Sequence, residues 1–122
     1  MARILVVDDE IDACRVLEEF LTAKGYEVLS AQDGPTAIRK VEEFKPHIVF
    51  LDIIMPGVGG IEVLHEIKRL DPQVAVIMVS VVTEPEKAKR TFDLGAYDYI
   101  TKPVDLDYLE KVVMVKLLDL LT

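Results

Sequence analysis

The residues of this sequence with the clearest capacity for chemistry stand where short apolar runs end. Residues 47–51 are apolar without alternation, and the run stops at Asp52. Such a run is typical of a strand buried on both faces of a parallel sheet. A loop rich in Gly with one Pro follows, so Asp52 is predicted at the carboxyl end of a central strand, where open α/β sheets hold their sites. We interpret its carboxylate as the reactive group.

Other polar residues occupy equivalent positions after further apolar runs. They are Asp8 and Asp9 after residues 3–7, Ser80 after residues 74–79, and Lys102 after residues 97–100. Each has a simple structural alternative, because Asp is favoured at helix N-termini and in turns, and Lys is usually a surface charge. If the first and third strands are neighbours, however, all these side chains converge at one edge of the sheet.

Strand and helix patterns alternate along the whole chain. Strands are predicted at residues 3–7, 26–31, 47–51, 74–79 and 97–100, and helices at 11–24, from Asp33-Gly34-Pro35 onward, at 60–70, from 83–86 to 94, and from about 105 to the end. This order predicts an α/β fold, a doubly wound parallel sheet with helices on both faces. In the fourth helix, Thr83-Glu84-Pro85-Glu86 has the spacing of a capping box, and Ala88 and Phe92 are the expected apolar contacts.

Composition limits the classes of protein to which the chain can belong. Its 122 residues, 51% hydrophobic and 30% charged, suit one globular domain spanning 1–122. A net charge of −8 argues against direct nucleic-acid binding. The N-terminus resembles neither a signal peptide nor a membrane span, so we expect a cytoplasmic protein without membrane association. The single Cys14 is expected to pack in the core.

The three acids have a chemistry of their own if they meet. Two carboxylates about 4 Å apart repel by roughly 4 kcal/mol at an effective dielectric constant of 20. Asp8, Asp9 and Asp52 together therefore need a cation or a proton, and oxygen ligands suit Mg²⁺ or Mn²⁺ rather than zinc. A metal there would make Asp52 a plausible nucleophile toward phosphorus, with Ser80 and Lys102 binding the remaining phosphoryl oxygens.

With Asp8-Asp9, Asp52-Ile-Ile-Met-Pro, Ser80 and Lys102-Pro103 in this order, the sequence resembles the receiver domain of bacterial two-component response regulators, including chemotaxis regulators. The resemblance covers essentially the whole chain. It implies a flavodoxin-like (βα)5 fold with strand order 2-1-3-4-5. It also implies a phosphoprotein in phosphorelay signal transduction, which catalyses only its own phosphorylation and dephosphorylation and is otherwise not an enzyme.

The resemblance also implies a role for each matching residue. Asp52 would accept a phosphoryl group from a histidine kinase and form an aspartyl phosphate. Asp8, Asp9, Asp52 and the backbone carbonyl of Ile54 would hold Mg²⁺. The remaining implied features are Ser80 as the switch hydroxyl, Tyr99 as the switch aromatic, Lys102 as the phosphate-pairing lysine, and a cis Lys102-Pro103 bond.

Signalling would proceed through the face formed by the fourth helix, the fifth strand and the fifth helix. That face would control an output domain or a partner protein. The last helix is apolar almost all the way round, including Met114, Val115, Leu118 and Leu121. We therefore expect it to form a homodimer or partner surface, or to continue into an output domain.

Three alternatives remain open. A phosphatase of the haloacid dehalogenase type also uses a nucleophilic Asp and Mg²⁺, but it needs a second acid where this chain has Ile54. A flavin or nucleotide carrier would need a Gly-rich loop after the first strand, where this chain has acids. A degenerate receiver would never accept phosphate, because Val81 replaces the usual Ala or Gly and could block the entrance.

Overall fold

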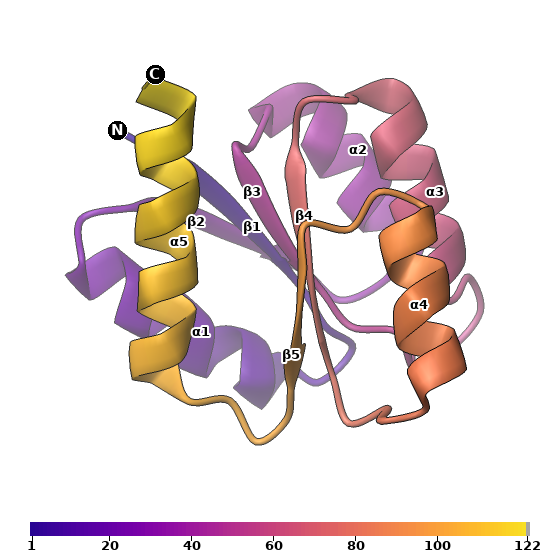
Figure 1. The fold of residues 1–122 in the computed structure, drawn as a ribbon. Helices are drawn as coiled ribbons and strands as arrows, with labels where there is room; N and C mark the ends of the chain where they lie inside the picture. Colours follow the sequence, from indigo (N-terminus) through magenta and orange to yellow (C-terminus); the bar gives the residue numbers. More distant parts are fainter. Residues whose placement is uncertain (122) are drawn as a thin grey trace.

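A computed structural model describes residues 1–121, without the side chain of Leu121, so the prediction for that side chain lies outside the described residues. Five parallel strands form one sheet in the order β2-β1-β3-β4-β5, which confirms the predicted fold (Figure 1). The strands are β1 (Arg3–Val7), β2 (Glu27–Ala31), β3 (Ile48–Leu51), β4 (Ala75–Ser80) and β5 (Asp98–Thr101). The helices are α1 (Ile11–Ala23), α2 (Gly34–Phe44), α3 (Gly60–Leu70), α4 (Pro85–Asp93) and α5 (Leu106–Leu121).

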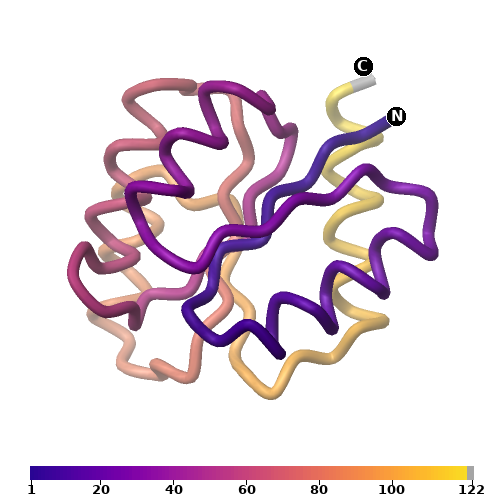
Figure 2. The backbone as a smooth tube through the Cα atoms, turned by 180° about the vertical axis from the view of Figure 1, so that it is seen from behind, coloured from indigo at the N-terminus to yellow at the C-terminus, as the bar shows by residue number. Residues whose placement is uncertain are grey.

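The helices form two layers. Helices α1 and α5 cover one face of the sheet, and α2, α3 and α4 cover the other (Figures 1 and 2). Alternate residues of the central strands feed two cores: Ile4 and Val6 pack on the α1–α5 side, while Leu5 and Val7 pack on the opposite side. Because β1, β3 and β4 are buried on both faces, their sequences show no alternation.

The start of α2 agrees with its sequence signal, whereas α4 differs. The Asp33 side chain accepts a hydrogen bond from the Thr36 N–H at 2.8 Å, so it caps α2. The predicted capping box of α4 is wrong: Glu84 is the N-cap residue and its side chain makes no capping hydrogen bond. Pro85, which takes the first helical position, moves the helix start one residue past the expected place.

The prediction that Phe92 provides an apolar contact of α4 is also wrong, since 46% of this residue is exposed. The buried residue of α4 is Thr91, whose hydroxyl donates to the Ala88 carbonyl at 2.7 Å. That internal bond lets a polar side chain occupy the helix face that meets the core. Cys14 is buried, as predicted.

Among the described residues, no helix combines the length and the apolar composition needed to cross a lipid bilayer.

The loop between β3 and α3 packs tightly against the strand end that carries Asp52. The Gly60 N–H donates to the Ile53 carbonyl at 2.8 Å. A Cβ atom at Gly60 would lie 1.9 Å from the Asp52 carbonyl oxygen and 2.6 Å from Ile53 Cα. Only glycine therefore lets α3 begin this close to the strand, and this close packing holds the backbone of Asp52 and Ile53.

We expect Gly60→Ala to lower the free energy of unfolding by about 3 kcal/mol or more, because the clash is with backbone rather than with a movable side chain. Gly59→Ala is the matched control, since its added Cβ would meet nothing closer than 3.8 Å. It should cost less than about 1 kcal/mol. Urea denaturation of both variants measures the difference, and equal losses would contradict this account.

Candidate functional site

The register of the central strands brings two of the predicted acids together. Val7 of β1 pairs with Leu51 of β3, so Asp8 and Asp52 are the next residues on neighbouring strands. The Asp52 N–H donates to the Val7 carbonyl at 3.0 Å, which extends the ladder by one bond. Both acids lie at the carboxyl edge of the sheet, as the sequence predicted, and both are buried, with 5% and 7% of their surface exposed.

Lys102 reaches the same place from the end of β5. Its Nζ donates to Asp8 Oδ2 at 2.6 Å and to Asp52 Oδ2 at 2.9 Å. Its backbone N–H donates to the Ser80 carbonyl at 2.9 Å, which continues the β4–β5 register. Burial acts to lower the pKa of Lys102, but the hydrogen bonds and charges of the two acids outweigh burial and raise the pKa above its ordinary value.

Asp9 completes an acidic cluster with these two residues. Asp8, Asp9 and Asp52 each offer a carboxylate oxygen, and the three atoms lie within 4.8 Å of one another. Asp9 is exposed, so the cluster opens to solvent on its side. Three carboxylates with one lysine carry a formal charge of −2. An oxygen-only donor set with that charge fits a hard divalent cation such as Mg²⁺.

Ser80 and Tyr99 both contact one residue of the loop after β4. Ser80 is fully buried, and its Oγ accepts from the Val82 N–H at 3.4 Å, a long and therefore weak bond. The Tyr99 hydroxyl donates to the Val82 carbonyl at 2.6 Å. Burial raises the pKa of the Tyr99 phenol, so the hydroxyl stays a donor at neutral pH. Val82 thus joins the two residues that were predicted to form a switch.

Two apolar residues that closely follow Asp52 and Ser80 in the chain are turned toward solvent. Ile54 and Val81 have exposed fractions of 57% and 59%. The Ile54 N–H donates to Asp52 Oδ1 at 3.2 Å, while the predicted metal contact of its carbonyl stays a prediction. The Lys102-Pro103 bond is cis, as the resemblance implies.

The sequence reasoning missed the contacts that backbone atoms make around the site. The Glu10 N–H donates to Asp8 Oδ1 at 3.0 Å, and the Cys14 thiol donates to the Asp8 carbonyl at 3.3 Å. Both contacts of Val82 likewise use its main chain. Since any residue except proline supplies the same backbone N–H and carbonyl groups, side-chain identity carried no signal for them.

A model of the response regulator receiver domain matches residues 4–114. The chain belongs to this family. Response regulator receiver domains act in phosphorylation-dependent signalling and are not classical enzymes, and this membership sets aside the phosphatase and flavin-carrier alternatives.

Individual relatives agree with the family model. Regulatory protein AtoC of Escherichia coli (strain K12) is 37% identical over 111 residues, which cover 91% of this receiver domain and 24% of AtoC. The structure of chemotaxis protein CheY4 of Vibrio cholerae matches with a TM-score of 0.89 at 28% identity, covering 93% of this chain and 97% of that one. NtrX of Brucella abortus matches with a TM-score of 0.89 at 37% identity, covering 95% of this chain and 27% of NtrX. The chain spans about a quarter of the length of the curated relatives that it matches.

For this receiver domain we expect Tyr99→Phe to lower the free energy of unfolding by about 0.5–1.5 kcal/mol, because it removes the hydrogen bond to Val82 and leaves that carbonyl unpaired. Tyr97→Phe is the control, since the Tyr97 hydroxyl has no hydrogen-bond partner among the described residues, and it should change stability by less than about 0.5 kcal/mol. Thermal or urea unfolding monitored by circular dichroism compares the two, and a larger loss for the control would refute the assignment.

Proposed function

We propose that Asp52 is the phosphoacceptor of this receiver domain and that phosphorylation there switches the α4–β5–α5 face. The observation that carries the proposal is the double contact of Lys102 with Asp8 and Asp52, because it gathers three strand ends around one carboxylate. The phosphodonor would be a histidine kinase. The whole chain, 1–122, would form the domain, and its cytoplasmic location stays a prediction.

The transfer itself needs few protein groups. One carboxylate oxygen of Asp52 bonds to phosphorus while the bond between phosphorus and the donor's leaving group breaks. Lys102, which already contacts Asp52, would pair with a phosphoryl oxygen. Asp8, Asp9, Asp52 and the Ile54 carbonyl would hold Mg²⁺, or Mn²⁺, which when bound neutralises phosphoryl oxygens and orients in-line attack. The domain would catalyse only its own phosphorylation and dephosphorylation.

The contacts of Val82 suggest how the new charge is reported. A phosphoryl group adds close to two negative charges and strong hydrogen-bond acceptors. The Ser80 hydroxyl, which accepts a long bond from the Val82 N–H and interacts with the Tyr99 side chain, would turn to donate to a phosphoryl oxygen. Because Val82 is bonded to both Ser80 and Tyr99, a shift of this loop would loosen the bond that holds the Tyr99 ring in place.

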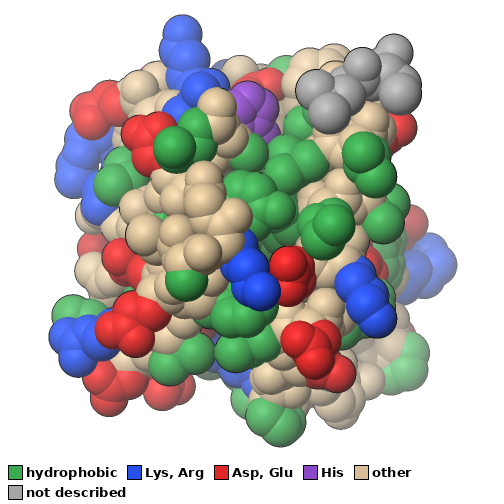
Figure 3. Space-filling view, turned by 90° about the vertical axis from the view of Figure 1, so that its left-hand side faces the viewer, with side chains coloured by type: hydrophobic (Ala, Val, Ile, Leu, Met, Phe, Trp, Pro, Cys, Tyr) green, Lys and Arg blue, Asp and Glu red, His purple; other side chains and the backbone are tan. Residues whose placement is uncertain are grey.

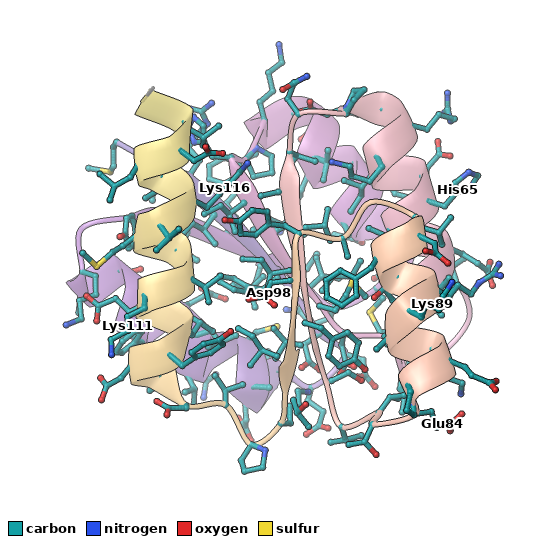
Figure 4. The ribbon with its side chains drawn as sticks, viewed as in Figure 1. His65, Glu84, Lys89, Asp98, Lys111 and Lys116 are labelled. Carbon is teal, nitrogen blue, oxygen red and sulfur yellow. The ribbon has the colours of Figure 1, made fainter. Side chains whose placement is uncertain are left out.

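The face that would respond is formed by α4, β5 and α5. Figure 4 shows Lys89 on α4, Asp98 on β5 and Lys111 on α5 on the same side of the molecule. The Tyr108 hydroxyl donates to Asp98 Oδ2 at 3.2 Å, so β5 and α5 are joined there. On α5, Val115 is 58% exposed, in keeping with a surface that an output domain, a partner or a second copy covers.

Incubation with acetyl phosphate and Mg²⁺ should add one phosphoryl group to the protein, detected by intact-mass spectrometry. Asp52→Asn should abolish the shift, and Asp9→Asn should slow it by at least about tenfold, because it weakens metal binding. Asp12→Asn is the matched control: Asp12 also lies near the start of α1, but its side chain is 90% exposed and outside the cluster, so its rate should be unchanged.

Other outcomes of this experiment have distinct meanings. Steady release of phosphate from the donor without a stable adduct, lost in Asp52→Asn, would show that dephosphorylation of Asp52 is faster than its phosphorylation. No reaction would favour the degenerate receiver, and recovery in Val81→Ala would show that the exposed valine blocks entry. Labelling that persists in Asp52→Asn would disprove the assigned acceptor.

We also expect beryllofluoride with Mg²⁺ to shift the amide NMR signals of Val82, Tyr99 and the α4–β5–α5 face, while α2 on the far side of the sheet changes little. Asp52→Asn should remove the response. Sedimentation equilibrium of the same samples tests for a homodimer, with Val115→Asp on α5 and Val16→Asp on α1 as paired variants of similar exposure, 58% and 54%. Unchanged signals at Tyr99 in the wild type would rule out the switch.

A further inference from the structure

A cavity of about 310 Å³ lies between α1 and the loop that joins β5 to α5. Its floor consists of buried side chains from three central strands, Val6, Phe50 and Val79. Ala13 and Leu17 of α1 form one wall, and the loop and the start of α5 form the other. Val16, which is exposed to solvent, also lines the cavity, so its apolar surface extends to the outside of the molecule.

One end of this cavity is polar and carries excess negative charge. Asp8, Glu10 and Lys102 line it, and Lys102 is already bonded to Asp8 and Asp52. The Glu10 carboxylate has no ion-pair or hydrogen-bond partner within the described part of the chain. The polar end therefore offers a free carboxylate next to an acidic cluster, which attracts a cation and repels an anion.

The rest of the cavity lining is apolar, and the volume of the cavity suits a small organic molecule. An apolar cavity of about 150 Å³ already accepts benzene, and ligand pockets begin at about 300 Å³. Hydrated metal ions gain nothing from walls of Val, Leu and Phe, whereas an aromatic or aliphatic body does.

We propose that this cavity binds a small primary amine with an apolar body of about one aromatic ring and a short chain, its ammonium facing Glu10 and Asp8. The cavity adjoins the proposed phosphoryl-transfer site, because Asp8 and Lys102 line both. A bound amine would place a positive charge beside the residues proposed to accept Mg²⁺. It would thus give a small molecule direct access to the phosphorylation pocket.

The test uses 4-phenylbutylamine as the probe, with 4-phenylbutan-1-ol and 4-phenylbutyrate as neutral and anionic analogues of the same body. Titrations followed by ¹H–¹⁵N NMR are made in buffer without Mg²⁺ or phosphate mimic, so the result is independent of whether Asp52 accepts phosphate. The amine should bind most tightly and the carboxylate least, with shifts concentrated at Ala13, Leu17 and Val104.

Two variant pairs decide the position of the probe. Ala13→Leu places a larger side chain into the cavity and should lower the affinity for the amine by at least about tenfold. Ala23→Leu, on the exposed end of the same helix, should leave binding unchanged. Glu10→Gln should lower the affinity for the amine by about fivefold and leave the affinity for the alcohol unchanged. Circular dichroism checks that each variant is folded.

Equal binding of the amine and the carboxylate would overturn the proposal, as would full binding in folded Ala13→Leu. Shifts confined to the cavity at the N-terminal end of the sheet, lined by Tyr26, His47 and Leu117, would also overturn it. If none of the three probes binds, the proposal is likewise overturned.

Discussion

Like charges held close together at one edge of the sheet impose the constraint on which this structure depends. Asp8, Asp9 and Asp52 place carboxylate oxygens within 4.8 Å, and one lysine from a distant strand faces two of them. Each pair of like charges at about 4 Å costs roughly 4 kcal/mol at an effective dielectric constant of 20. The buried strands β1 and β3 hold Asp8 and Asp52 at this distance despite the repulsion, and the ion pairs of Lys102 offset part of it.

Such a cluster has to be connected to a surface before it can signal. The proposed connection runs through main-chain groups of Val82, which hydrogen-bond to Ser80 on one side and to Tyr99 on the other. The first bond is long and the second is short, so the loop is held more firmly by the aromatic ring than by the hydroxyl beside the acids. In the proposed switch, a new partner for Ser80 competes with this long bond and with the interaction between the Ser80 and Tyr99 side chains, so the change would reach Tyr99. The side of the molecule that carries α5 shows hydrophobic side chains among acidic and basic ones (Figure 3).

The sequence predicted the strands well because β1, β3 and β4 are buried on both faces and their apolar runs end where the sheet ends. Convergence of Asp8, Asp52 and Lys102 followed from parallel topology, once the strand order was taken from the family resemblance. The start of α4 was not predictable from its capping-box spacing, because Pro85 competes for the first helical position. The burial of Thr91 in place of Phe92 depends on an internal hydrogen bond, which periodicity does not encode. Contacts made by backbone atoms, those of Val82 above all, leave no trace in residue identity.

The acidic cluster and the cavity beside it both attract cations, but their surroundings differ. They therefore suit different cationic ligands. Carboxylate oxygens clustered at a solvent-facing edge favour a small, hard cation that keeps part of its water. Glu10 lies at the polar end of the largely apolar cavity, where a hydrated ion would lose water without gaining contacts. An organic ammonium, in contrast, buries its carbon body there and keeps its charge at the polar end. Asp8 borders both places, so one carboxylate would face either kind of cation, and the surrounding walls would decide which one binds.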